Sequence, residues 1–219
     1  MSWTTIASDD FNRANGLLTS PWVQDGWLGR VLPTIFSNQI RTSSDGSYAA
    51  ANRTDLGTVN EKQFAEMDHI FVNSSRTYTT QFNIRMSHVS YADLQIVANR
   101  NLYYMFIEGN SVVSPGAAIY VLTGGSFTQV GSYHTFGAPL PGTGTVWTVR
   151  AEADGSNISA KLTVGGVTYT GTRTDATHPT GSPAGIHLDN SVLSRNDNWA
   201  AGHWVLASPL LLMRRHHGG

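Results

Sequence analysis

Two carboxylates in this chain have a spacing that glycosidic bond cleavage uses. Glu66 and Asp68 are separated by one residue, so on a β-strand both side chains lie on the same face. Retaining glycoside hydrolysis needs two carboxyl groups about 5 Å apart, one as the nucleophile and one as the acid. The three residues after Asp68, which are His69, Ile70 and Phe71, include no further Asp or Glu that could serve as a separate acid beside this pair. We therefore predict no catalytic residues, and we expect Glu66 and Asp68 to be solvent-facing partners of arginine side chains.

Histidines, glycines and serines offer no other reaction centre. The chain has eight His and no Cys, and the His spacings do not match a metal site. The Gly-Thr-Gly stretch at residues 142–144 lacks the Lys-Ser/Thr pair of a phosphate-binding loop. No serine lies in the context of a nucleophile elbow. We predict no cofactor, and we interpret the histidines as hydrogen-bonded surface or core residues.

Aromatic residues are the other candidates for binding, because a flat aromatic face can stack on a sugar ring. The chain has six Trp and eight Tyr. Three lie in strand-like patterns and are expected in the core: Trp147, Trp199 and Trp204. Five lie near the start of the chain or in expected loops and are better candidates for exposure: Trp3, Trp22, Trp27, Tyr48 and Tyr91. Of these, Trp27, Tyr48 and Tyr91 are our candidate carbohydrate-binding residues.

The elements that must carry these side chains are β-strands. In residues 76–88, Tyr78, Thr80 and Phe82 alternate with polar residues, which is the pattern of a half-buried strand. Further strands are predicted at 102–107, 117–122, 127–133, 146–153, 158–164, 167–170 and 185–188, with Gly-containing turn pairs between several of them. Residues 28–37 and 43–59 are expected to be surface loops. This many short strands indicates two antiparallel sheets.

The charge and the hydropathy of the chain indicate which classes of partner it does not bind. Only 13% of the residues are charged, the formal net charge is −1, and the body of the chain has no basic run. We therefore expect no nucleic acid partner. No apolar stretch reaches the roughly 20 residues that a membrane-spanning helix requires, so we expect no membrane insertion. The first residues lack the pattern of a secretion signal, so we expect synthesis in a cytoplasm.

The two ends of the chain carry related phrases. Residues 9–18 read D-D-F-N-R-A-N-G-L-L and are followed by Pro21-Trp22, and residues 195–199 read R-N-D-N-W. The opening resembles that of concanavalin A-like (laminin-G-like, lectin/glucanase) jelly-roll domains, which are common in minor tail proteins of phages that infect actinobacteria. The resemblance spans about residues 6–202. It implies an all-β, two-sheet antiparallel jelly-roll β-sandwich, with Phe11 and Trp199 buried on or beside adjacent terminal strands.

The same resemblance bears on chemistry. Retaining β-glucanases of this superfold carry the pattern Glu-x-Asp-x-x-Glu, and Phe71 stands here in place of the final acid. Laminin-G-like domains sometimes hold calcium with loop oxygens, and five residues of this chain are candidate ligands: Asp9, Asp10, Asp189, Asn190 and Asp197. The alternative, which we favour, is that these Asp and Asn side chains cap turns. We therefore predict no metal.

The end of the chain changes character after the domain. We assign residues 1–204 to the sandwich and residues 205–219 to a docking tail. An apolar and cationic run forms the expected assembly contact: Leu210, Leu211, Leu212, Met213, Arg214 and Arg215.

The main hypothesis for function is a non-enzymatic phage virion protein, which is a minor tail or accessory surface protein. We expect it in the virion, where it binds other virion proteins and further copies of itself. The alternatives are a carbohydrate-binding module that recognises host-envelope glycans and, less favoured, a glycoside hydrolase.

Overall fold

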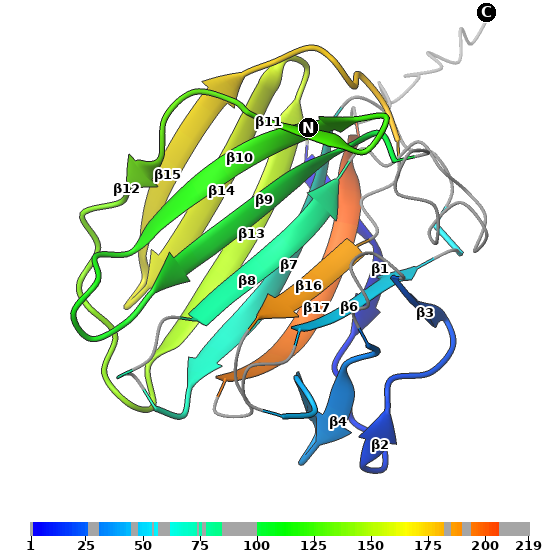
Figure 1. Cartoon of the computed structure of the whole chain (residues 1–219), viewed down its shortest axis with the longest axis vertical. Coiled ribbons are helices and arrows are strands. Elements are labelled where there is room, and N and C mark those ends of the chain that lie inside the picture. Colours follow the sequence, from blue (N-terminus) through cyan, green and yellow to red (C-terminus); the bar gives the residue numbers. More distant parts are fainter. Residues whose placement is uncertain are drawn as a thin grey trace, which may run out of the picture.

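The protein is described from a computed structural model, which covers residues 2–25, 31–44, 48–53, 55–56, 62–73, 75, 78–84, 100–181, 185–189 and 194–205. Every regular element in these ranges is a β-strand, and the strands form two stacked layers (Figure 1). No helix in this part of the chain is long and apolar enough to cross a membrane. The fold is thus the two-sheet antiparallel jelly-roll β-sandwich that the sequence predicts.

One layer is a nine-stranded sheet. Its strands are β1 (Ser2–Asp9), β2 (Gly16–Leu17), β4 (Thr34–Phe36), β5 (Gln39–Arg41), β7 (Lys62–Phe71), β13 (Val146–Asp154), β14 (Asn157–Val164), β15 (Val167–Thr174) and β17 (Ser194–Val205). They lie in the order β15-β14-β13-β7-β17-β5-β4-β2, and β1 also pairs with β17. Val205, which we had assigned to the tail, is therefore the last residue of a strand.

The other layer is an eight-stranded sheet. Its strands are β3 (Trp22–Gln24), β6 (Tyr48–Arg53), β8 (Tyr78–Ile84), β9 (Leu102–Gly109), β10 (Gly116–Thr123), β11 (Ser126–Gln129), β12 (His134–Thr135) and β16 (Gly185–Asp189). They lie in the order β11-β10-β9-β8-β16-β6-β3, and β12 pairs with β10. The edge formed by β9, β10 and β11 is thus separated from β6 and β3 by β8 and β16.

Alternation along the strands places the core between the sheets. On β9, Tyr103, Met105 and Ile107 are buried in the main apolar cluster, and the residues between them face the opposite side of the sheet. From the other sheet, Trp147 on β13 packs its ring 4.5 Å from that of Phe71. Thr80 and Phe82 of β8 also face inward and are buried, as the period-two pattern predicts.

The Gly-Gly pair between β14 and β15 confirms a predicted hairpin. Val164 pairs with Val167, which leaves Gly165 and Gly166 as a two-residue turn. Their φ angles are +57° and +79°, in the left-handed region that Gly adopts without a Cβ penalty. Because such turns match the twist of the strands, this pair fixes the register of β15.

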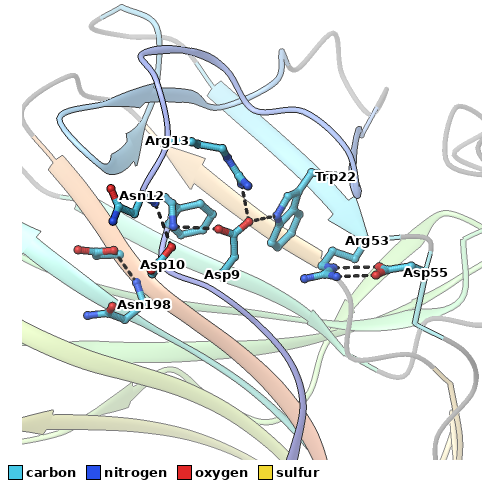
Figure 2. A network of polar contacts seen from close by, with 10 residues as sticks. Asp9, Asp10, Asn12, Arg13, Trp22, Arg53, Asp55 and Asn198 are labelled. Carbon is cyan, nitrogen blue, oxygen red and sulfur yellow. Dashed lines mark hydrogen bonds and ion pairs between the residues drawn. The ribbon is translucent and has the colours of Figure 1, made fainter.

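The opening phrase of the chain fastens β1 to the rest of the sandwich. β1 runs antiparallel to β17, with Asp9 opposite Trp199, so the two terminal phrases lie side by side as predicted. The Asp9 carboxylate accepts hydrogen bonds from the Phe11 backbone N–H (2.8 Å), the Trp22 indole N–H (2.7 Å) and the Arg13 guanidinium (2.5 Å) (Figure 2). Phe11 and Trp199 are both fully buried, which confirms their predicted place in the core.

Both surface loops expected in the first third of the chain contain strands. Residues 34–36, within the expected loop 28–37, form β4, on which Ile35 is only 1% exposed. Residues 48–53, which we expected in a surface loop, form β6, and Ala49, Ala50 and Ala51 on it are fully buried. Alanine has low strand propensity and this run has no polar alternation, so the usual strand signal was missing. Trp22, one of the five candidates for exposure, is only 2% exposed because it packs 4.8 Å from the ring of Trp199.

A buried ion-pair cluster lies at the β3 side of the eight-stranded sheet. Asp25, directly after β3, accepts hydrogen bonds from Asn52 (2.9 Å), His187 (3.0 Å) and both terminal nitrogens of Arg100. All four side chains are at most 1% exposed. Burial acts to raise the pKa of Asp25, but hydrogen bonds and charges from His187 and Arg100 outweigh it and hold that pKa well below its ordinary value. Arg100 is therefore a structural anchor of this sheet.

Candidate functional site

The carboxylates on β7 are occupied by structural contacts. Glu66 accepts a hydrogen bond from Arg150 at 2.9 Å, and Arg150 also binds Glu152 at 2.6 Å. The prediction of an arginine partner is confirmed for Glu66. It is wrong for Asp68, whose carboxylate accepts hydrogen bonds from the Thr148 hydroxyl (2.7 Å) and the Asn198 amide (2.9 Å). The bulge of β17 next to Asp68 brings Asn198 within reach.

Phe71 lies on the opposite face of β7 from Glu66 and Asp68. Its side chain is fully buried between the sheets, and its ring lies 4.6 Å from that of His69. Since odd-numbered positions of this strand face the core, position 71 does not place a side chain beside the two carboxylates.

His69 is a core residue. Its Nδ1 lies 2.7 Å from the Thr80 hydroxyl and 3.1 Å from the Asn196 amide oxygen. Complete burial lowers its pKa to about 4, so the ring is neutral at physiological pH. This agrees with the interpretation of the histidines as hydrogen-bonded surface or core residues.

The candidate calcium ligands that the structure describes do cap turns. Asp9, Asp10 and Asp197 each accept a hydrogen bond from the backbone N–H of a residue one or two positions further on. The side chain of Asp189 and all of Asn190 lie outside the described residues. Within the described ranges, no group of three or more His, Cys, Asp or Glu has the arrangement of a metal site.

Of the three candidate carbohydrate-binding residues, the structure describes one. Tyr48, the first residue of β6, is 50% exposed, as expected for a binding residue. Trp27 and Tyr91 lie outside the described residues. The expected assembly contact also lies outside them: Leu210, Leu211, Leu212, Met213, Arg214 and Arg215.

The structure gathers aromatic rings that the sequence analysis did not single out. Five of them cover the outer side of β9, β10 and β11 and the segment that follows β11: Tyr104, Phe106, Tyr120, Phe127 and Tyr133. We call this surface the aromatic face. Adjacent ring centroids are 5.9 Å apart for Phe106 and Tyr120, and 6.1 Å for Tyr120 and Phe127.

Strand register explains how the aromatic face forms. Tyr104 on β9 lies directly opposite Tyr120 on β10, and Phe127 on β11 lies opposite Leu122 on β10. Directly opposed residues share one side of a sheet, so the rings gather on the side away from the core. Tyr104 is nearly buried at 7%, whereas Phe127 is 38% exposed. The signal that could have found this surface was the alternation Leu-Tyr-Phe at 102, 104 and 106 beside Tyr120.

Tyr133 extends the aromatic face over a glycine. A Cβ atom at Gly116 would lie 2.4 Å from the Tyr133 hydroxyl, so the ring lies where any larger residue would collide with it. Its centroid is 6.5 Å from that of Phe106, and its side chain is 38% exposed. Burial raises the pKa of the Tyr133 phenol, and the charge and hydrogen bond of Glu108 raise it further. The phenol therefore stays protonated and donates to Glu108, which fixes the ring.

Comparison with known proteins identifies the architecture. No protein-family model and no curated protein sequence matches the chain significantly. Solved structures do match. The carbohydrate recognition domain of Emp47p aligns with a TM-score of 0.60 at 12% identity, over 93% of this chain and 97% of that chain. The CBM2 module of the evolved Dit of Lactobacillus casei BL23 phage J-1 aligns with a TM-score of 0.58 at 10% identity, over 94% and 98%.

The carbohydrate-binding module CBM66 from Bacillus subtilis also matches, with a TM-score of 0.57 at 11% identity, over 83% of this chain and 95% of that module. The fold is that of lectins and carbohydrate-binding modules. Structures from studies of glycan-degrading enzymes share it as well. At these identities the likeness concerns the fold, so the choice among functions depends on the side chains of this chain.

Proposed function

We propose that the protein is a carbohydrate-binding domain whose aromatic face stacks on the sugar rings of a glycan chain. The observation that carries the proposal is the continuous surface of Phe106, Tyr120, Phe127 and Tyr133, in which Phe127 and Tyr133 are 38% exposed. Exposed aromatic rings that touch one another along a sheet are costly to leave in water and are typical of a binding surface. Lectin and carbohydrate-binding-module folds among the similar structures support the same function.

The shape of the aromatic face favours a chain of sugars. Neighbouring strands lie about 4.8 Å apart, so β9 to β11 span about 10 Å, which is room for more than one sugar ring. Glu108 and Gln129 border the rings and offer polar groups to sugar hydroxyls. Rigid rings supply contact area at low entropic cost, and a few polar groups set orientation, which is the usual division of labour in a ligand site.

Replacing Phe127 by alanine is expected to weaken binding of the best glycan on an array by about tenfold or more. Truncating a central aromatic contact costs about 2 kcal/mol, and 1.4 kcal/mol is a factor of ten. Titration calorimetry with that glycan measures the change in affinity.

Two variants serve as controls. Tyr133→Phe, which keeps the ring and removes the hydroxyl, should retain most of the affinity. Val167→Ala, at a 53%-exposed position of the edge strand β15, should not change the affinity. Wild-type affinity in Phe127→Ala would exclude the aromatic face as the site.

We propose further that the domain is not an enzyme. Glu66 is held by Arg150, and Phe71 faces the core on the other side of β7, so the described part of the strand offers Glu66 and Asp68 no carboxylic acid at the position of the family pattern. A reducing-sugar assay on the glycans that bind is expected to show no product, in wild type and in Glu66→Gln alike. Hydrolysis by the wild type that Glu66→Gln abolishes would establish a glycosidase instead.

A second candidate function, a component of a phage virion, is favoured by the likeness to the phage J-1 Dit module and by the opening phrase of the chain. In this proposal the protein is a minor tail or accessory surface protein, and the aromatic face attaches the particle to host-envelope glycans. Residues 206–219 would dock on other virion proteins or on further copies of the chain. Mass spectrometry of purified particles tests it, and absence of the protein from particles would rule it out.

A further inference from the structure

The strand β15 is a long, regular edge of the nine-stranded sheet (Figure 1). Its eight residues, Val167–Thr174, pair with β14 without a bulge or a proline, and Arg173 is its only charged residue. The other edge strands that the structure describes are shorter or irregular. β2, β3, β11 and β12 have two to four residues, and the pairing of β1 with β17 shifts between Thr5 and Ala7. Because long regular edges readily pair with another strand, β15 is the edge at which a partner strand fits best.

The hairpin turn decides which residues of β15 point their backbone groups toward the free edge. Val167 lies opposite Val164 across the two-residue turn, and such a closing pair is hydrogen-bonded. Hydrogen-bonded and non-hydrogen-bonded pairs alternate along an antiparallel ladder, so the odd-numbered residues of β15 bond to β14. The even-numbered residues therefore point their N–H and C=O groups away from β14, and all four are exposed: Thr168, Thr170, Thr172 and Thr174.

One of these backbone groups already has a partner in the chain. The C=O of Thr172 accepts a hydrogen bond from Arg173 Nη1 at 2.9 Å, and Nη2 of the same guanidinium donates to the Ser132 C=O at 2.6 Å. Both bonds are exposed to water, and a carbonyl oxygen accepts two hydrogen bonds. Within the described part of the chain, a strand that pairs with β15 therefore competes with water and with this one exposed contact.

We propose that β15 pairs with β15 of a second copy of this chain, antiparallel about a two-fold axis at Gly171. Residues 168–174 read T-Y-T-G-T-R-T, which is nearly the same in both directions. In this register, position 168 lies opposite 174 and position 170 lies opposite 172. Every threonine that points its backbone groups to the edge then forms a hydrogen-bonded pair with a threonine of the second copy. Any other antiparallel register leaves at least one of these threonines outside such a pair.

The side chains also fit this register. On the outer side of the sheet, the threonines form Thr–Thr pairs, which are favourable cross-strand neighbours. At the axis Gly171 has no side chain, and a Cβ atom there would lie 2.4 Å from the His134 ring of its own copy. Tyr169 lies opposite Arg173 of the second copy, which brings a guanidinium beside an aromatic ring. No like charges oppose each other, so the edge is complementary to itself, and a two-fold pair uses the edge of both copies.

The pair would place two aromatic faces on the same side of the dimer. A two-fold axis that relates antiparallel strands of one continuous sheet is perpendicular to that sheet, so both eight-stranded sheets lie on the same side of it. His134 of β12, which pairs with β10, lies against Gly171, so the β10 edge with the aromatic face is next to the axis. Two faces that bind one glycan surface raise the overall affinity, a consequence that rests on the proposed function.

Sedimentation equilibrium of the full chain without glycan tests the pairing. A contact along one strand is small for a protein interface, so we expect a weak dimer with a dissociation constant in the micromolar range. Thr170→Pro should weaken dimerisation about tenfold or more, because the symmetry removes the same N–H from both copies. That N–H does not bond to β14, so circular dichroism should stay near that of the wild type. Thr170→Val, which keeps the N–H, is the matched control and should dimerise like the wild type.

Two outcomes of this experiment would overturn the proposal. One is a wild-type chain that stays monomeric at about 1 mM, well above the expected dissociation constant. The other is a Thr170→Pro dimer as tight as that of the wild type. Phe127→Ala should dimerise like the wild type, so failure of the dimer is distinguishable from failure of the glycan site.

Cysteine cross-linking tests the register without the proline variant. The chain has no native Cys. In the proposed pair, the Cα atoms of Thr170 and of Thr172 in the second copy lie about 5.5 Å apart, within the range of a disulfide. A mixture of Thr170→Cys and Thr172→Cys chains should therefore form covalent dimers under mild oxidation faster than either chain alone, whose cysteines lie about 7–8 Å apart on a diagonal. Equal rates in the mixture and in the separate chains would overturn the pairing about Gly171.

Discussion

Replacing Trp199 by alanine is expected to destabilise the fold by about 3–5 kcal/mol, the cost of truncating a large aromatic side chain in a core. Trp199 is fully buried, contacts the ring of Trp22 at 4.8 Å, and lies opposite Asp9 where the first and last strands pair. The cavity would therefore open at the point that joins β1 to the sandwich. For a chain of this size the melting temperature should fall by roughly 6–20 °C.

Trp204 on the same strand is the matched control. The sequence analysis expected it in the core, which is wrong: it is only partly buried, and its ring contacts Trp3 at 5.0 Å on the outer side of the sheet. Trp204→Ala should therefore cost clearly less than Trp199→Ala in the same thermal or denaturant unfolding experiment. Equal destabilisation by the two substitutions, or an unchanged melting temperature for Trp199→Ala, would contradict the packing described here.

The second large effect is expected at the buried ion-pair cluster. Asp25→Ala should destabilise the fold by about 3–5 kcal/mol, because removing one partner leaves the charge of Arg100 buried. Arginine cannot lose its proton to escape this cost, and Arg100 is only 1% exposed. Arg100→Met should cost less, since His187 still binds the carboxylate of Asp25 at 3.0 Å. Urea unfolding of the two variants measures both values.

Asp154→Ala provides the comparison for that experiment. Asp154 is paired with Lys62 at 2.8 Å, but its side chain is 51% exposed, and ion pairs in water contribute about 1 kcal/mol or less. If Asp25→Ala lowers the free energy of unfolding by no more than Asp154→Ala does, the buried ion-pair cluster contributes little to stability.

Most strands of this protein can be predicted from its sequence, whereas the groups of side chains that form its candidate binding surface cannot. Strands with clear alternation, such as β8, and hairpins with a Gly-Gly turn, such as that at Gly165, follow from local patterns. The β1–β17 pairing follows from the resemblance of the end phrases to a known family. The strand β6 cannot be predicted in either way, because its three buried alanines do not alternate with polar residues.

The aromatic face was missed for a related reason. Tyr104, Phe106 and Tyr120 look like core residues in a one-dimensional pattern, since apolar residues also occupy the positions between them. Only the register between β9, β10 and β11 shows that they share the outer side of the sheet. The open pocket lined by Asp9, Asp10, Arg53 and Asn198 likewise depends on the β17 bulge and on a turn after β1, which come together only in the folded chain.

The most direct test of the central claim, that the aromatic face binds carbohydrate, is an NMR titration with the glycan that binds best on an array, read on the aromatic side chains. The account predicts that the rings of Phe106, Tyr120, Phe127 and Tyr133 shift together with increasing ligand, while Trp147 in the core does not. Binding of glycan that leaves all four rings unmoved, or no binding to any glycan on a broad array, would contradict it.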